Sequence, residues 1–86
     1  MNDEITKDTK DWFFNIKKDL LSLMLKCEIE GKKKHSEAFQ IISNQLLIIV
    51  LEIDQLNGER KFRTSLKKAE SSLKLLNSQF KQFTRK

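Results

Sequence analysis

The chain has no proline, no tyrosine and only two glycines among its 86 residues. Sheets and long loops depend on turn residues such as proline and glycine, so their scarcity argues against both. Hydrophobic residues make up 38% of the chain and charged residues 34%, which is too apolar for a disordered tail. The composition therefore predicts one small helical domain with short connections and a modest core.

The residues that carry most protein chemistry are also scarce, with a single cysteine and a single histidine. One Cys and one His cannot supply a tetrahedral zinc site, and two glycines cannot form a glycine-rich phosphate loop. We expect Cys27 to be a small buried core residue. His35 follows Lys32–Lys34 with no triad-like partner nearby, so we expect a solvated loop residue. The sequence predicts no catalytic residue, no metal, no cofactor and no small-molecule substrate, and thus a protein that is not an enzyme.

Long apolar segments are missing as well. The longest uninterrupted apolar run is Leu46–Leu51, with six residues, whereas a membrane-spanning helix needs about 20. The N-terminal segment Met1–Glu4 is acidic, where a secretory signal would be basic and would lead into an apolar stretch. A lone cysteine cannot form an intramolecular disulfide, which suits a reducing compartment. The sequence therefore predicts a cytoplasmic protein.

Apolar residues recur in alternating steps of three and four along the chain, which is the period of an amphipathic helix. Three such seams occur, and their members are Phe13, Ile16, Leu20, Leu23 and Cys27, then Phe39, Ile42, Leu46, Ile49, Ile53 and Leu56, and finally Phe62, Leu66, Ala69, Leu73, Leu76, Phe80 and Phe83. Gly31 and Gly58 mark helix ends, since glycine enters the left-handed region without penalty. We expect helices over about 9–30, 36–57 and 60–84 in a single domain.

Short connections force neighbouring helices to run antiparallel. The predicted fold is therefore all-α. It is either an antiparallel three-helix bundle or a long helical hairpin, and we expect it to self-associate.

The first two helices carry more apolar side chains than one seam can bury. The middle of the second helix is apolar nearly all round, and such a helix must be covered on several sides. Apolar surface left exposed after folding would mark an interface, so we expect a homodimer or another protein partner. The interface candidates are Trp12, Leu21, Leu25, Leu47, Ile48, Val50 and Leu51.

Charge is unevenly distributed along the chain. Residues 1–59 carry eight lysines against eleven carboxylates, a net charge of −3, while residues 60–86 carry nine basic residues against Glu70, a net charge of +8. Basic residues at seven-residue spacing flank the third seam, and together with the lysine run they could follow nucleic-acid phosphates non-specifically. The anion or nucleic-acid candidates are Lys32, Lys33, Lys34, Arg60, Arg63, Lys67, Lys74 and Lys81.

This basic stripe has two other interpretations. Charges beside a heptad seam can select partner and orientation by pairing across the interface, and carboxylates on the other helices could supply the opposite charge. A basic amphipathic helix can also lie on an anionic membrane surface. Because the third seam is needed for the bundle, membrane binding is the weakest of the three interpretations.

In size, basicity and helical organisation the chain is similar to the small intracellular immunity proteins that protect bacteriocin producers. Small phage-encoded inhibitors and secretion adaptors share this general character. The resemblance implies a non-enzymatic protein-interaction module, an adaptor, inhibitor or immunity-type protein, that acts through helix packing. The alternative function is a small basic nucleic-acid-associated protein that binds phosphates through the third helix and the Lys32–Lys34 loop.

Overall fold

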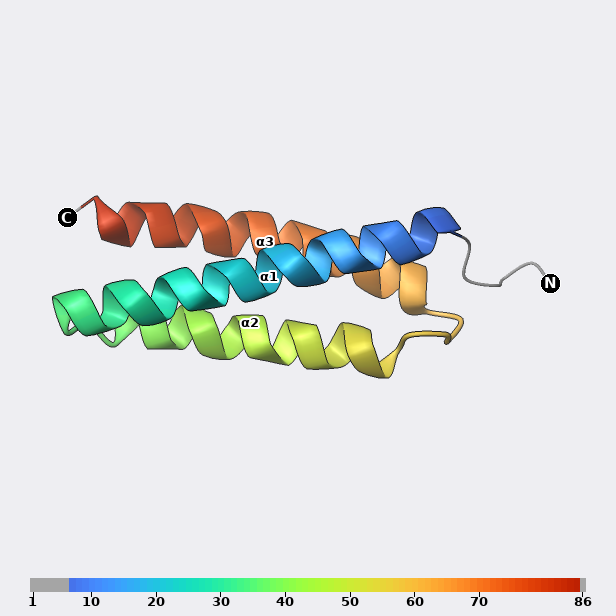
Figure 1. Ribbon diagram of the computed structural model, residues 1–86, viewed down its shortest axis with the longest axis horizontal. Coiled ribbons are helices and arrows are strands. Elements are labelled where there is room, and N and C mark those ends of the chain that lie inside the picture. Colours follow the sequence, from blue (N-terminus) through green and yellow to red (C-terminus); the bar gives the residue numbers. More distant parts are fainter. Residues whose placement is uncertain (1–6, 86) are drawn as a thin grey trace.

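The computed structural model describes residues 7–85, which form three helices: α1 (Lys7–Lys34), α2 (Ala38–Gln55) and α3 (Phe62–Thr84). Each helix packs against both others, and the chain runs up, down and up again along a rod of 50 × 18 × 15 Å (Figure 1). The predicted antiparallel three-helix bundle is confirmed for this part of the chain. Because α1 and α3 run in the same direction, their C-terminal ends meet at one end of the rod, on the left in Figure 1.

Helix α1 is longer than predicted, because it passes through Gly31 and continues for nearly one more turn. At Gly31 the two helices approach closely: a Cβ built on this glycine would be 3.5 Å from the Cβ of Phe39. The residue that enters the left-handed region is instead His35, with φ 51°. The prediction that Gly31 ends the first helix was therefore wrong. Lys32–Lys34 form the last turn of α1 instead of a loop, where cations interact favourably with the negative end of the helix dipole.

The connection between α2 and α3 is longer than predicted, since α2 ends at Gln55 and α3 begins at Phe62. Gly58 lies within it and has φ 91°, in the left-handed region that favours glycine. Arg60 also lies in this connection, ahead of the first residue of α3. It is therefore not part of the helical stripe to which the seven-residue spacing assigned it.

The core follows the predicted seams, with one change in α2. Val50 is only 6% exposed and belongs to the core, while Ile49 is half-buried beside it. The prediction of Val50 as an interface residue was wrong, because α2 contacts both α1 and α3 and buries a face wider than one seam. The buried apolar residues are Ile16, Leu20, Leu23, Cys27, Phe39, Ile42, Leu46, Val50, Ile53, Phe62, Leu66, Ala69 and Leu76.

Aromatic rings close the core at both ends. At the end where α1 turns into α2, Phe39 packs edge to face against Phe80 and Phe83 of α3, with ring centroids 5.6 and 6.0 Å apart. Towards the opposite end, Phe13 of α1 packs against Phe62 of α3 at 5.3 Å. These pairs tie α3 to α2 at one end and to α1 at the other, in the tilted geometries that aromatic rings prefer.

One polar residue is buried against this core without a partner. Ser65 is 7% exposed, and its Oγ makes no hydrogen bond within the described residues. Because a buried unsatisfied hydroxyl is costly, we expect Ser65→Ala to raise the free energy of unfolding by about 1 kcal/mol in urea denaturation. The control Ser71→Ala, at an exposed position of α3, tests helix propensity alone and should add less than about 0.5 kcal/mol. Equal effects of the two substitutions would contradict a cost of burial at Ser65.

Candidate interaction surfaces

The outer face of α2 carries no charge over most of its length, and its exposed residues are apolar or uncharged polar, the latter including Gln40, Asn44 and Gln45. No charged residue occurs from Ala38 to Leu51. Within this stretch, Ile41, Leu47, Ile48 and Leu51 are between 44 and 65% exposed. A contiguous apolar patch on a small protein is typical of an interaction site.

Two contacts fix the register in which α1 lies against α2. Lys17 Nζ is 2.9 Å from Asp54 Oδ1, in an exposed hydrogen-bonded ion pair. Near the other end of α2, Gly31 lies against Phe39. These contacts show that the first half of α1 lies beside the second half of α2. The second half of α1 lies beside the first half of α2, as in an antiparallel hairpin.

This register extends the apolar surface of α2 onto α1. Leu21 and Leu25, which are 45 and 58% exposed, lie on the α1 flank that adjoins Leu47 and Leu51 of α2. The two helices together therefore present one exposed apolar surface. We define the apolar face by the residues Leu21, Leu25, Leu47, Ile48 and Leu51.

The apolar face contains five of the seven predicted interface residues. The other two lie elsewhere, because Val50 is in the core and Trp12 is half-buried and packs against it. Apolar residues that were not among the candidates are exposed as well. They are Phe14, Ile29, Ile41 and Leu75, between 52 and 67% exposed. All four lie off the three seams, which is the signal that could have identified them.

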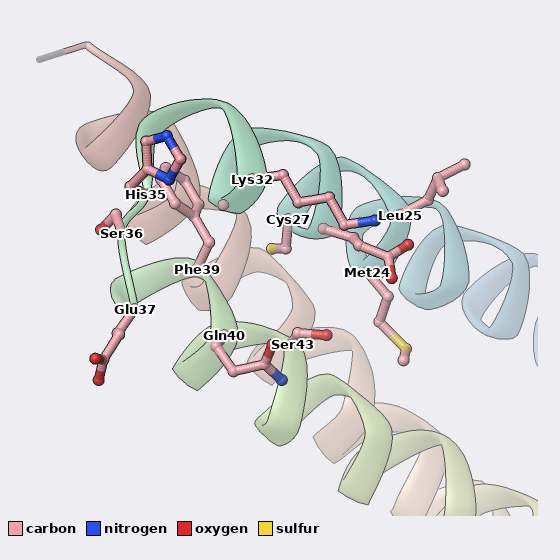
Figure 2. A pocket seen from close by; sticks show the side chains of 12 residues that line it. Met24, Leu25, Cys27, Lys32, His35, Ser36, Glu37, Phe39, Gln40 and Ser43 are labelled. Atoms are coloured by element: carbon pink, nitrogen blue, oxygen red, sulfur yellow. The ribbon is translucent and has the colours of Figure 1, made fainter.

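A cleft of about 560 Å³ opens between α1 and α2 beside their connection (Figure 2). Met24 and Leu25 line it from α1, while Gln40 and Ser43 line it from α2. Leu25 belongs both to this cleft and to the apolar face. Glu28, Lys32 and Glu37 line the cleft as well, so charged side chains border the apolar face at this end of the bundle.

Cys27 lies in this cleft, with its sulfur directed between the helices in Figure 2. The residue is 1% exposed, as expected of a core cysteine, and burial raises the pKa of its thiol to about 11. A thiol with this pKa is neutral at pH 7 and therefore lacks the thiolate that a nucleophile requires. The cleft thus offers surface for packing, and its cysteine is not activated for chemistry.

The raised pKa of Cys27 has a consequence for stability at high pH. The folded-state pKa of about 11 lies above the ordinary value of 9.0, so folding favours the neutral thiol. Its contribution is fully present below pH 9 and is lost as the pH rises through about 11. We expect the free energy of unfolding of the wild type to fall more steeply across this range than that of Cys27→Ala, measured by urea denaturation. Parallel pH profiles would contradict this expectation.

The parallel course of α1 and α3 joins two basic segments that are far apart in the sequence. Lys34 Nζ, in the last turn of α1, donates a hydrogen bond to the backbone carbonyl of Thr84 at the end of α3, at 2.9 Å. The same Nζ lies 3.9 Å from Glu30 Oε1. The predicted Lys32–Lys34 segment therefore lies at the same end of the bundle as Lys81 and the end of α3.

The basic stripe of α3 flanks its groove with α1. Asn77 lies in this groove opposite Ser22 and Lys26 of α1. Lys74 and Lys81 lie three residues before and four residues after Asn77, so they share its side of the helix. Farther back on this side are Lys67 and Arg63, and all four stripe residues are exposed.

Within residues 7–85, no residue of this stripe forms an ion pair. The ion pairs in this range are Lys17–Asp54 and Lys34–Glu30. One interpretation of the stripe was that its cations pair with carboxylates of the other helices. No such pair forms in this part of the monomer. The stripe keeps its charge exposed to solvent. We define the basic groove by Lys26, Lys33, Lys74 and Lys81, where Lys33 lies two turns beyond Lys26 on the same flank of α1.

None of the helices within residues 7–85 has the length and apolar character needed to cross a membrane. In the same range, no three His, Cys, Asp or Glu residues are grouped so that they could hold a metal ion. Comparisons of the chain with protein-family models, with curated proteins and with solved structures found no match.

Proposed function

We propose that this protein is a non-enzymatic interaction module that pairs with a second copy of itself through the apolar face. The observation that supports the proposal is the presence of five large apolar side chains on the outer surface of α1 and α2, each between 44 and 65% exposed, with Ile48 at the edge that adjoins Leu75 of α3. Removing such surface from water is the main driving force of protein association. As a dimer, the protein would act by helix packing, as an adaptor, inhibitor or immunity-type protein does.

The charge distribution favours a second copy as the occupant of this face. Because α2 is uncharged from Ala38 to Leu51, two copies related by a two-fold axis can pack α2 against α2 without burying a charge. At the edge of the face, Lys17 and Asp54 already neutralise each other. A strongly charged partner would find no opposite charge on α2 between Ala38 and Leu51.

The dimensions of the face also suit a dimer. A stable interface buries about 800 Å² on each partner. This is about one eighth of the 6377 Å² surface of the chain. Helix α2 has 18 residues and is therefore about 27 Å long, and α1 lies beside it for its whole length. The five residues that define the apolar face span about one turn of each helix, so an interface of this size also takes in neighbouring uncharged residues of α2.

The proposal is tested by light scattering coupled to size-exclusion chromatography across a series of protein concentrations. We expect twice the chain mass of 10.2 kDa at high concentration, with dissociation on dilution. A mass of 10.2 kDa at every concentration up to about 100 µM would overturn the proposal, because even a micromolar dimer would be populated there.

A further inference from the structure

We propose that the basic groove between α1 and α3 binds the phosphate backbone of a nucleic acid. The groove lies on the opposite flank of α1 from Leu25, so it is separate from the apolar face and does not depend on the dimer. It is formed by the fold, since Lys26 and Lys33 are about 50 residues from Lys74 and Lys81 in the sequence.

The positive charge of the basic groove is not neutralised by its surroundings. Its four lysines are exposed and make no ion pair within the described part of the chain. Of the carboxylates lining the groove, Glu30 lies 3.9 Å from Lys34, and Asp19 shares the N-terminal hollow of the groove with Lys26 and Asn77. Glu70 lies one turn before Lys74 on α3. It forms no ion pair with any lysine of the groove. The potential at the C-terminal half of the groove is therefore positive.

The spacing of the lysines suits a strand of phosphates. Lys74 and Lys81 are seven residues apart, about 10 Å along the helix at 1.5 Å per residue. This distance equals about three phosphate steps of 3.4 Å along one strand. Lys26 and Lys33 repeat the same interval on the parallel helix α1. Between the two rows lie Ser22 and Asn77, whose side chains can donate hydrogen bonds to phosphate oxygens, together with the apolar residues Leu23, Leu73 and Phe80.

The groove favours nucleic acid over a membrane or a protein. A helix that lies on a membrane inserts an apolar face, but the seam of α3 is buried, with Leu66 and Leu76 at most 3% exposed. A protein interface is centred on apolar or aromatic anchors. The large exposed apolar residue at this groove is Ile29, which lies at the edge of the groove and not at its centre. Exposed cations on both sides of a groove, with Ser22 and Asn77 between them, supply the charge and the hydrogen-bond donors that phosphate contacts use.

The test uses the full-length protein and fluorescently labelled duplex and single-stranded DNA, with anisotropy measured at several salt concentrations. We expect binding near 50 mM salt, because phosphate contacts are strongest at low ionic strength. Four phosphate contacts predict a loss of about 150-fold for duplex DNA between about 50 and 200 mM salt, and about 50-fold for a single strand. Vesicles containing phosphatidylserine serve as the competing anionic surface.

A pair of charge-matched variants locates the site. Lys74→Glu with Lys81→Glu changes the groove. Lys61→Glu with Lys68→Glu makes the same change in net charge at the same spacing, on the opposite flank of α3 and at the residue that precedes its first turn. We expect the first pair to weaken DNA binding at least tenfold more than the second and to lower the salt slope by about two. All four positions are exposed, so circular dichroism should show a folded bundle for both variants.

Three results would overturn the proposal. The first is the absence of DNA binding near 50 mM salt. The second is equal weakening by the two variant pairs, which would mean attraction to net charge without a site. The third is binding to the vesicles in preference to both forms of DNA. Because Ile48→Glu should leave DNA binding intact, failure here is distinguishable from failure of the proposed dimer.

Discussion

Replacing Ile48 with glutamate is expected to turn the dimer into monomers without unfolding the bundle. Ile48 is 65% exposed in the monomer, so a carboxylate there remains in water and should change the monomer's stability by less than about 0.5 kcal/mol. In the dimer the same carboxylate would be buried on an uncharged surface. An unpaired buried charge costs about 3 kcal/mol or more, which corresponds to at least about 100-fold weaker association. Sedimentation equilibrium measures the change directly.

A matched control separates this effect from added charge. Gln82→Glu introduces a carboxylate at an exposed position of α3, away from the apolar face. Association of this variant should be within about twofold of the wild type, since distant surface charges are screened by salt. If Ile48→Glu and Gln82→Glu associate equally well, the apolar face is not the interface.

Replacing Phe39 with alanine is expected to be the most destabilising single change in the core. Phe39 is 1% exposed, lies against Gly31, and packs on the rings of Phe80 and Phe83. Removing a buried phenyl ring costs about 3–5 kcal/mol, a large part of the 5–15 kcal/mol that stabilises a typical domain. We expect the urea midpoint of Phe39→Ala to fall accordingly, or the variant to be partly unfolded in buffer.

The control for this prediction is the same substitution at a surface position. Phe14 is 67% exposed, so Phe14→Ala removes a ring that makes little contact with the core. Its free energy of unfolding should change by less than about 0.5 kcal/mol. A loss below about 1 kcal/mol for Phe39→Ala would contradict the central packing of this ring.

The helical fold could be predicted from the sequence because the apolar period runs nearly unbroken through all three helices. Periodicity gives the direction of each buried face, but not its width. Helix α2 contacts two neighbours, so its buried face takes in Val50 as well as the seam, and this depends on tertiary packing. Similarly, Gly31 looked like a helix end, although α1 continues through it and packs there against Phe39.

The candidate surfaces could be predicted only in part, for a related reason. Surplus apolar residues off the seams identified Leu21, Leu25 and Ile48, but the joining of α1 and α2 into one face depends on their register. The register is fixed by contacts such as Lys17–Asp54, which join residues 37 positions apart. The basic groove depends in the same way on the parallel course of α1 and α3, which no local pattern specifies.

The most direct test of the apolar face is the dilution of ¹⁵N-labelled protein, followed residue by residue through its backbone amide shifts. Dimerisation through this face predicts concentration-dependent shifts centred on Leu47, Ile48 and Leu51 of α2, with smaller shifts at Leu21 and Leu25 of α1. The amides around Lys81 should not move. Shifts that are absent at all concentrations, or that centre on α3, would contradict an interface on the apolar face.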